Sequence, residues 1–272
     1  MARRPGAAPT TTPGPTRSVA IHRAAAEGFS RNATDYERSR PGYPPAAVAH
    51  LVTALGLGPG ITVVDVAAGT GKLTRLLTPS GARVIAVEPV GEMRDLLART
   101  AEGVEVVEAT VEHMPLGDAS ADAATVAQAF HWFDGPAALS ELSRVLRPAG
   151  GLAVVYNQRD RDLPWLAEVN ALVEAHRHGV PQQWDGAWRE AFETTTLFTP
   201  LEETTFDNPQ ELGTDEFIIR LRSMSYVGAL PPAEQQQLFT RVADVLASHP
   251  DTAGRPRLVI PQCTVVSICR RR

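Results

Sequence analysis

Short apolar blocks alternate with helix-compatible stretches through the middle of the chain. The blocks are rich in valine, isoleucine, leucine and alanine and lack alternating polar residues, which is typical of strands covered on both faces. They cover residues 61–66, 83–87, 104–108, 123–127 and 152–156. Helices are predicted between them over 73–77, 92–100 and 137–146. Because strands alternating with helices form right-handed βαβ units, we predict a doubly wound α/β fold.

The pattern differs on both sides of this region. Pro44 and Pro45 begin a predicted helix over 46–55, and Gly56 ends it. After residue 157, helices are predicted over 163–178, 217–221 and 235–246. Strands are predicted over 201–206 and, after Pro261, within 258–269. We expect these two strands to join the same sheet, with helices inserted between them.

Composition narrows the classes of partner. The chain has 272 residues, 43% of them hydrophobic and 21% charged, which is ordinary for a globular protein of one or two domains. The net charge is −5 and no basic stripe is present, so no nucleic-acid partner is expected. No apolar run approaches the ~20 residues of a membrane span, so no membrane partner is expected either.

Cysteine use and the N-terminal composition bear on location. Cys263 and Cys269 fall at even spacing on one predicted strand, on the same face and too far apart to bridge. Two small core-type thiols are typical of a reducing compartment. Residues 5–16 are of low complexity, and we expect a disordered tail over 1–27 without a secretory signal. A cytoplasmic location is predicted.

The most informative segment follows the first predicted strand. Asp65 lies at the end of that strand, and Gly69 and Gly71 follow in a loop that leads into a helix. Glycines let a backbone approach a ligand, and the helix presents unpaired N–H groups. A phosphate-binding P-loop is excluded because no hydroxyl residue follows Lys72. A dinucleotide site fits poorly because Thr74 stands at its third glycine.

This loop resembles motif I of the class I S-adenosylmethionine (SAM)-dependent methyltransferases, which has the pattern acid-x-Gly-x-Gly-x-Gly. Asp65, Gly69 and Gly71 match, and Ala67 replaces the first glycine. Alanine requires either a negative φ or a mildly strained backbone there. The resemblance implies that Asp65, Ala67, Gly69 and Gly71 belong to a SAM site.

Two later segments resemble the same family in order and spacing. Glu88, Pro89 and Met93 match an acid-Pro-x-x-x-Met segment, which implies that Glu88 binds ribose and that Met93 packs near adenine. Glu88 alone does not discriminate SAM from a nicotinamide cofactor. Residues 109–116 resemble a Gly-Asp-Ala-Glu-x-Leu-Pro segment. Contacts to the cofactor are implied there for Thr110, Val111 and Glu112, with Thr110 in place of the usual aspartate.

Residues 128–133 resemble the Gln-Ala-x-His-x-Phe run that follows the fourth strand in this family. The resemblance implies that Gln128 and Ala129 lie beside the cofactor and that His131 lies where cofactor and acceptor meet. His131 is a candidate general base, and the alternative is a structural histidine bonded to the backbone or the tail. The turn at 147–151 marks the fold and implies no chemistry.

Residues 29–44 resemble the F-x-x-x-A-x-x-Y-x-x-x-R-P-x-Y-P opening of small-molecule methyltransferases, the methyltransferase domain 11 or trans-aconitate methyltransferase-like group. In that group the segment covers the cofactor. Tyr36 and Arg40 would share one helical face, and Arg40 would pair with the carboxylate of SAM. The alternative is that both are surface residues of an ordinary helix.

The resemblance implies a Rossmann-like methyltransferase fold with a seven-stranded, mostly parallel sheet, helices on both faces and an antiparallel last strand. We expect a SAM-binding core with an N-terminal helical cover over 28–157. Residues 158–272 would supply acceptor-side helices and the last two strands. Guesses for acceptor contacts are Trp132, Phe133, Trp165, Trp184, Trp188 and Arg222, although each aromatic residue could equally belong to the core.

The implied reaction is methyl transfer from SAM to an O, N, S or C nucleophile of a small molecule, mainly by proximity and orientation. A non-catalytic methyltransferase-like binding protein and a nicotinamide-dependent oxidoreductase are the alternatives. No metal site is predicted. The acceptor, the use of a base and the oligomeric state stay open.

Overall fold

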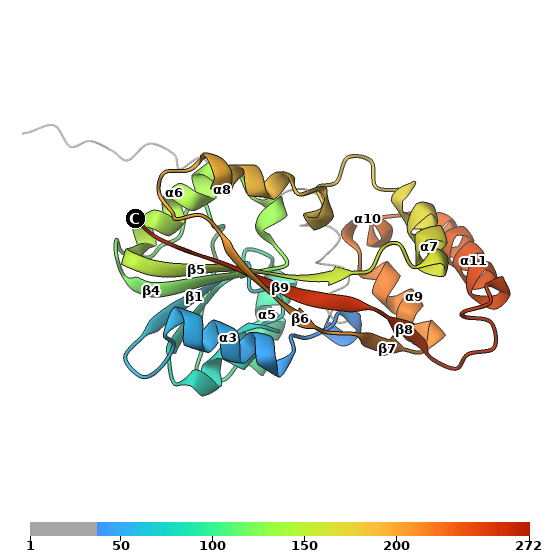
Figure 1. The fold of residues 1–272 in the computed structure, drawn as a ribbon, viewed down its shortest axis with the longest axis horizontal. Coiled ribbons are helices and arrows are strands. Elements are labelled where there is room, and N and C mark those ends of the chain that lie inside the picture. The colour runs from blue at the N-terminus through green and yellow to red at the C-terminus, as the bar shows by residue number, and fades with distance from the viewer. Residues whose placement is uncertain (1–36) are drawn as a thin grey trace, which may run out of the picture.

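The computed structural model describes residues 37–272 and contains one seven-stranded sheet with a smaller part at one end (Figure 1). The strand order is β3-β2-β1-β4-β5-β9-β6. Neighbouring strands are parallel from β3 to β5, and β9 is antiparallel to both β5 and β6. The bounds are β1 Thr62–Val66, β2 Arg83–Val87, β3 Glu105–Val107, β4 Ala121–Ala127, β5 Leu146–Arg159, β6 Glu202–Asp207 and β9 Gln262–Arg270. The predicted fold class, with its antiparallel last strand, is confirmed.

Helices cover both faces of the sheet because alternate strand residues point to opposite sides. One face packs against α3 (Pro45–Leu55), α4 (Thr74–Leu77) and α5 (Gly91–Thr100). The other face packs against α6 (Gly135–Val145) and α8 (Glu190–Thr194). Strands with both faces buried have no polar side to reveal, which explains why the sequence shows blocks rather than alternation.

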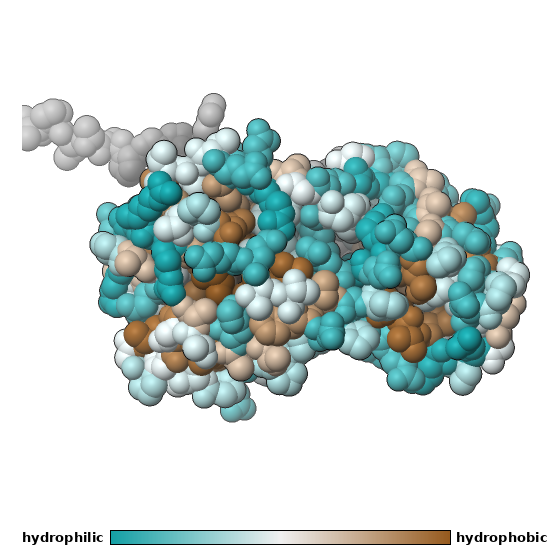
Figure 2. All heavy atoms as spheres, in the orientation of Figure 1, coloured by the Kyte–Doolittle hydropathy of each residue, from teal (hydrophilic) through white to brown (hydrophobic). Residues whose placement is uncertain are grey.

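The smaller part has a hydrophobic core of its own, and the long strands β5 and β9 run from the main sheet toward it (Figure 1). Its elements are α7 Pro164–Glu174, β7 Gln210–Leu212, α9 Thr214–Arg222, α10 Ser225–Gly228, α11 Pro232–Ser248 and β8 Leu258–Ile260. Figure 2 shows the waist between the two parts, with hydrophilic residues over much of this face. The predicted helical insertion between the last two strands is confirmed.

One local prediction differs from the structure, and two local features were not predicted. β5 begins at Leu146, so residues expected in a turn over 147–151 belong to a strand that pairs with β4 and β9. Trp184 and Trp188 lie on two separate short 3₁₀ turns, with Gly186, whose φ is 74°, between them. The antiparallel pair β7–β8 was not predicted, since strands of three residues are too short to show a period.

Candidate functional site

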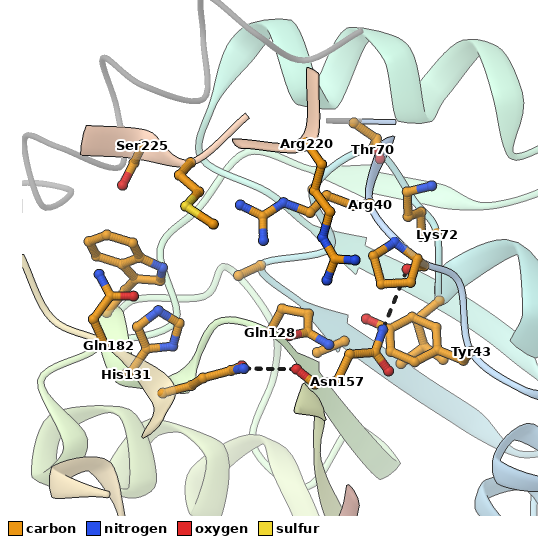
Figure 3. A pocket seen from close by; sticks show the side chains of 18 of the residues that line it. Arg40, Tyr43, Thr70, Lys72, Gln128, His131, Asn157, Gln182, Arg220 and Ser225 are labelled. Atoms are coloured by element: carbon orange, nitrogen blue, oxygen red, sulfur yellow. Dashed lines mark hydrogen bonds between the residues drawn. The ribbon is translucent and has the colours of Figure 1, made fainter. Parts of the chain in front are cut away.

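A pocket opens at the carboxyl ends of β1, β4 and β5 (Figure 3). The chain runs outward from β1 to β2 and β3 and then returns to β4 on the other side of β1. Open α/β sheets bind ligands at such a switch point. The pocket encloses about 1050 Å³ of empty space, open solvent included. Its lining comes from the N-terminal segment, the loop after β1, the ends of β4 and β5, and the smaller part.

The loop after β1 has a backbone suited to close approach by a ligand. Ala67, Gly69 and Gly71 have positive φ values of 51°, 59° and 84°. A left-handed backbone is ordinary for glycine but costs other residues about 1–2 kcal/mol. Of the two backbones expected for Ala67, a negative φ or a mildly strained one, the structure has the strained one. Backbone strain of this kind clusters at functional sites, where surrounding structure maintains it.

Gln128, just after the end of β4, combines a left-handed backbone with a buried side-chain amide that lacks a partner among the described residues. Its φ is 59°, unusual for a residue with a side chain. Its backbone N–H donates to Val155 O at 2.8 Å, which ties the turn to β5. Its side-chain Nε2 is buried and has no hydrogen-bond partner among the described residues. An unpaired buried amide is costly, so a bound ligand would satisfy it.

Asp65 is buried and holds the loop from beneath. Its carboxylate accepts hydrogen bonds from Thr74 Oγ1 at 2.6 Å and from Thr125 Oγ1 at 2.8 Å. Burial raises the pKa of Asp65 to about 6, although both hydrogen bonds act in the opposite direction. The two threonines belong to α4 and β4, so Asp65 links the loop's helix to the neighbouring strand.

Glu88 holds the same loop from the end of β2. Its Oε2 accepts the Gly69 N–H at 2.7 Å, and its Oε1 accepts the Val90 N–H at 2.8 Å. Burial raises the pKa of Glu88 to about 7. Each carboxylate oxygen has a second lone pair, so Glu88 can accept further hydrogen bonds from a ligand. Met93 Sδ lies 3.7 Å from where a Cβ on Gly69 would stand.

The structure brings some of the predicted cofactor residues into the pocket lining and leaves others outside it. Arg40, Ala67, Gly69 and Gln128 line the pocket, as does His131. The described candidates outside this lining are Asp65, Gly71, Glu88, Pro89, Met93, Thr110, Val111, Glu112 and Ala129. Tyr36 lies outside the described residues.

His131 is held through its Nδ1 atom by Tyr156. The Tyr156 Oη accepts the His131 backbone N–H at 3.0 Å and lies 3.1 Å from Nδ1. Both contacts are satisfied when the Tyr156 hydroxyl donates a hydrogen bond to Nδ1, so the neutral imidazole carries its own proton on Nε2. Burial lowers the pKa of His131 to about 3, and Arg40 adds to the effect. A neutral ring with a protonated Nε2 is a hydrogen-bond donor, which favours the structural alternative over the general base.

The first described residues fasten the N-terminal segment over the loop. Glu37 accepts hydrogen bonds from Thr70 Oγ1 at 2.5 Å and Arg75 Nη2 at 2.6 Å, and its carbonyl accepts from Lys72 Nζ at 2.5 Å. Arg40 Nε donates to Ser223 Oγ at 3.0 Å, just after α9. The segment therefore connects the loop after β1 to the smaller part, and Glu37 is a contact that sequence reasoning missed.

Several other lining residues were also missed. Asn157 and Arg159 end β5, and the rule that ligands bind at strand carboxyl ends could have identified them. Gln182 and Arg220 come from segments with no recognisable signature. Of the aromatic guesses, Trp132 and Trp184 line the pocket, whereas Phe133, Trp165 and Trp188 pack in hydrophobic cores and Arg222 lies outside the lining.

Comparison with known proteins bears directly on this geometry. The methyltransferase domain family matches residues 64–154. A protein of Mycobacterium tuberculosis named as uncharacterized methyltransferase Rv3342 is 39% identical over 230 residues, which are 85% of this chain and 90% of the relative. The chain belongs to this methyltransferase family.

More distant relatives agree. The uncharacterized methyltransferase C25B8.09 of Schizosaccharomyces pombe is 30% identical over 82% of this chain and 88% of its own. A solved structure from Anaeromyxobacter dehalogenans, described as a candidate type II methyltransferase, superposes with a TM-score of 0.60 at 26% identity. The match covers 86% of this chain and 97% of that one. The fold is that of the SAM-dependent methyltransferases, so the nicotinamide-dependent alternative is rejected.

Two general features of the described residues complete the picture. Over 37–272, no helix is long and apolar enough to cross a membrane. Within the same range, no group of three or more histidine, cysteine or acidic side chains is placed to hold a metal ion. Cys263 and Cys269 are both free thiols.

Proposed function

We propose that the protein binds SAM at the loop after β1 and transfers its methyl group to a small molecule held in the same pocket. The observation that carries the proposal is the unsatisfied and strained geometry around this loop. Ala67 and Gln128 both have left-handed backbones, and the Gln128 amide is buried without a partner among the described residues. Such features are costly unless a ligand uses them.

The residues present fit SAM in charge and hydrogen bonding. Glu88 has free lone pairs for two ribose hydroxyls, and Met93 offers a polarizable sulfur beside the loop. The Arg40 guanidinium is suited to the carboxylate of SAM. Further contacts are proposed for Tyr36, Gly71, Pro89, Thr110, Val111, Glu112 and Ala129. Asp65 would support the loop through its threonine hydrogen bonds rather than contact the ligand.

Bound SAM supplies a methyl group already activated by a sulfonium. The protein's task is therefore to orient the acceptor and to exclude water, and no strong base is required when the nucleophile is already deprotonated. His131, neutral and with its proton on Nε2, can donate a hydrogen bond that positions an acceptor. Residues after 157 supply the acceptor side, including Trp184 and Tyr226.

The test is calorimetric titration of purified protein with SAM, S-adenosylhomocysteine and NADH. We expect binding of the first two and none of NADH. Glu88→Gln should weaken S-adenosylhomocysteine at least about tenfold, because an amide cannot accept from two hydroxyls as a carboxylate does. Glu108→Gln is the matched control, since Glu108 is an exposed carboxyl after β3 that pairs with Arg94.

Each outcome of the titration leads to a different conclusion. Absence of S-adenosylhomocysteine binding by the wild-type protein would reject the proposal. Equal affinity in the wild type and Glu88→Gln would remove Glu88 from the site while leaving SAM binding intact. Methyl transfer is then measured by release of S-adenosylhomocysteine across candidate acceptors, and SAM binding without turnover would support the non-catalytic alternative.

A further inference from the structure

The pocket has a charge distribution unlike the rest of the chain. The chain carries 31 acidic and 26 basic residues, for a net charge of −5. Yet the described residues that line the pocket include four cations and no aspartate or glutamate. The four are Arg40, Lys72, Arg159 and Arg220. An acidic protein that gathers only positive charge at one concave site has a site for an anion.

Two of these cations already have assignments. Lys72 donates to the Glu37 carbonyl, and its Nζ lies 3.8 Å from the Glu37 carboxylate. Arg40 is assigned above to the carboxylate of SAM. Arg159 and Arg220 are therefore the guanidinium groups that the cofactor does not require.

Arg220 has only neutral hydrogen-bond acceptors among the described residues. It is 3% exposed. Its Nη1 donates to Gln210 Oε1 and its Nη2 donates to Gln262 Oε1 at 3.1 Å, while its buried Nε has no partner in this range. In Figure 3 its guanidinium projects into the pocket between Arg40 and Gln128. Amide oxygens orient the group but do not neutralise it.

Arg159 is half-buried and only partly compensated by negative charge. Its buried Nη1 has no hydrogen-bond partner among residues 37–272. The acid that acts on it, Glu174, is bonded to Arg161 instead. Burial lowers the pKa of Arg159 to about 10, and the positive charge of Arg40 adds to this effect. Burial and the positive charges of Arg159 and Arg40 likewise hold the pKa of Arg220 well below its usual range.

The physical consequence follows from the cost of buried charge. A guanidinium removed from water is destabilising unless an anion pairs with it, and two such groups also repel each other. A carboxylate or phosphate placed between them would remove both costs and accept bidentate hydrogen bonds. The pocket is thus preorganised for an anion at the junction of β5 and α9.

The rest of the acceptor side combines aromatic and apolar side chains with the polar residues Gln182, Gln183 and Ser225. Trp132, Trp184, Met224 and Tyr226 line it. Trp184 is held in place by Arg161, whose guanidinium lies 4.1 Å above the ring centroid. Flat apolar walls favour a flat or apolar body over a fully hydrated one.

We propose that the methyl acceptor is a small amphiphilic anion, with one carboxylate or phosphate group bound by Arg159 and Arg220 and an aromatic or apolar body against Trp132 and Trp184. The inference rests on the proposed function, since it names the acceptor class for that same pocket. Arg159 and Arg220 would then determine specificity, because they select acceptors by their negative charge rather than by their size.

The test is calorimetric titration in the presence of saturating S-adenosylhomocysteine, with three probes of similar size. Phenylacetate carries a carboxylate, phenyl phosphate carries a phosphate, and phenylacetamide is neutral. We expect at least one of the two anions to bind at least about tenfold more tightly than the amide. Whichever anion binds identifies the head group.

Arg159→Met is the informative variant, because Arg159 has no hydrogen bond at Nη1 to lose within the described part of the chain and methionine preserves its apolar stem. It should weaken the bound anion at least about tenfold and leave phenylacetamide unchanged. Arg241→Met removes the same charge from an exposed position on α11 and should have no effect. Melting temperatures of both variants show that they are folded.

Three results would overturn the proposal. Neither anion binding better than the amide would remove the anionic class. An Arg159→Met protein that binds the anions as the wild type does would remove the residue. A tenfold loss of S-adenosylhomocysteine affinity in Arg159→Met would assign the guanidinium to the cofactor. If the wild type binds an anion but not S-adenosylhomocysteine, the proposed function fails while the anion site stands.

Discussion

Asp65→Asn should change how stability depends on pH, because Asp65 is a buried acid with no cation beside it among residues 37–272. It is 1% exposed and has two threonine hydroxyl donors. Burial raises its pKa from 3.8 to about 6. Between pH 3.8 and about 6, the folded state therefore keeps a proton on Asp65 that the unfolded state has already released. The contribution of Asp65 to stability falls as the pH rises through this range.

The magnitude follows from the shift. The contribution is fully present below pH 3.8 and is lost as the pH rises through about 6. One pKa unit corresponds to 1.36 kcal/mol, so the total loss is about 3 kcal/mol. Most of it, about 2 kcal/mol, falls between pH 4 and pH 8, since the loss begins at the unfolded pKa. Asparagine at this position does not titrate and should abolish that loss.

The assay is urea denaturation of both proteins at several pH values from 4 to 8. The quantity that matters is how the difference in unfolding free energy changes with pH. Any constant cost of placing an amide beside Thr74 and Thr125 cancels in that change, and so does the titration of groups that the charge of Asp65 does not affect. Glu88 is the exception, because the Asp65 charge is the last and smallest of the causes that shift its pKa. From pH 4 to pH 8, the unfolding free energy of Asp65→Asn should rise by about 2 kcal/mol relative to that of the wild type.

Glu102→Gln is the control, because it removes a carboxyl group of the same charge from an exposed position. A difference between wild type and Asp65→Asn that stays flat within about 0.5 kcal/mol would refute the reasoning. It would mean either that water reaches the carboxylate or that the threonine hydrogen bonds offset the burial completely.

The other predictions concern packing, backbone strain and His131. Phe130→Ala should lower the free energy of unfolding by about 3–5 kcal/mol in urea denaturation, because the ring is 1% exposed and packs on Trp188 and Phe192; a loss below about 1 kcal/mol would contradict the packing. Ala67→Gly should stabilise by at most about 1 kcal/mol in the same assay, since relief at φ of 51° is partly offset by the greater freedom of unfolded glycine, and clear destabilisation would argue against the strain. The imidazole of His131 should stay neutral from pH 8 down to pH 5 in an NMR titration, because burial lowers its pKa to about 3; a midpoint near 6.5 would restore it as a candidate base.

The sequence was sufficient for the sheet because the relevant signals are local. Strand β2 was predicted over 83–87, its bounds in the structure, since a buried parallel strand is an apolar block bounded by polar residues. The loop at 67–71 could be identified because its glycines record a backbone requirement in the residue type itself. The same is true of the helix ends at Pro45 and Gly56, which depend only on φ preferences.

The pocket's chemistry could not be found in this way. Arg159 and Arg220 are 61 positions apart on elements of different kinds, and nothing near either residue indicates that the fold brings both into one pocket. His131 shows the same limit from the opposite side. Its residue type suggests a base, but Tyr156, 25 positions away, decides which ring nitrogen carries the proton.

Local backbone preferences and apolar blocks are properties of neighbours along the chain, so the sequence by itself determined the family, the fold class and the loop. Charge compensation, protonation and the lining of a cavity depend on which side chains meet across the fold and how much water they exclude. Only the tertiary structure decided those properties, because they belong to pairs of distant residues rather than to any segment.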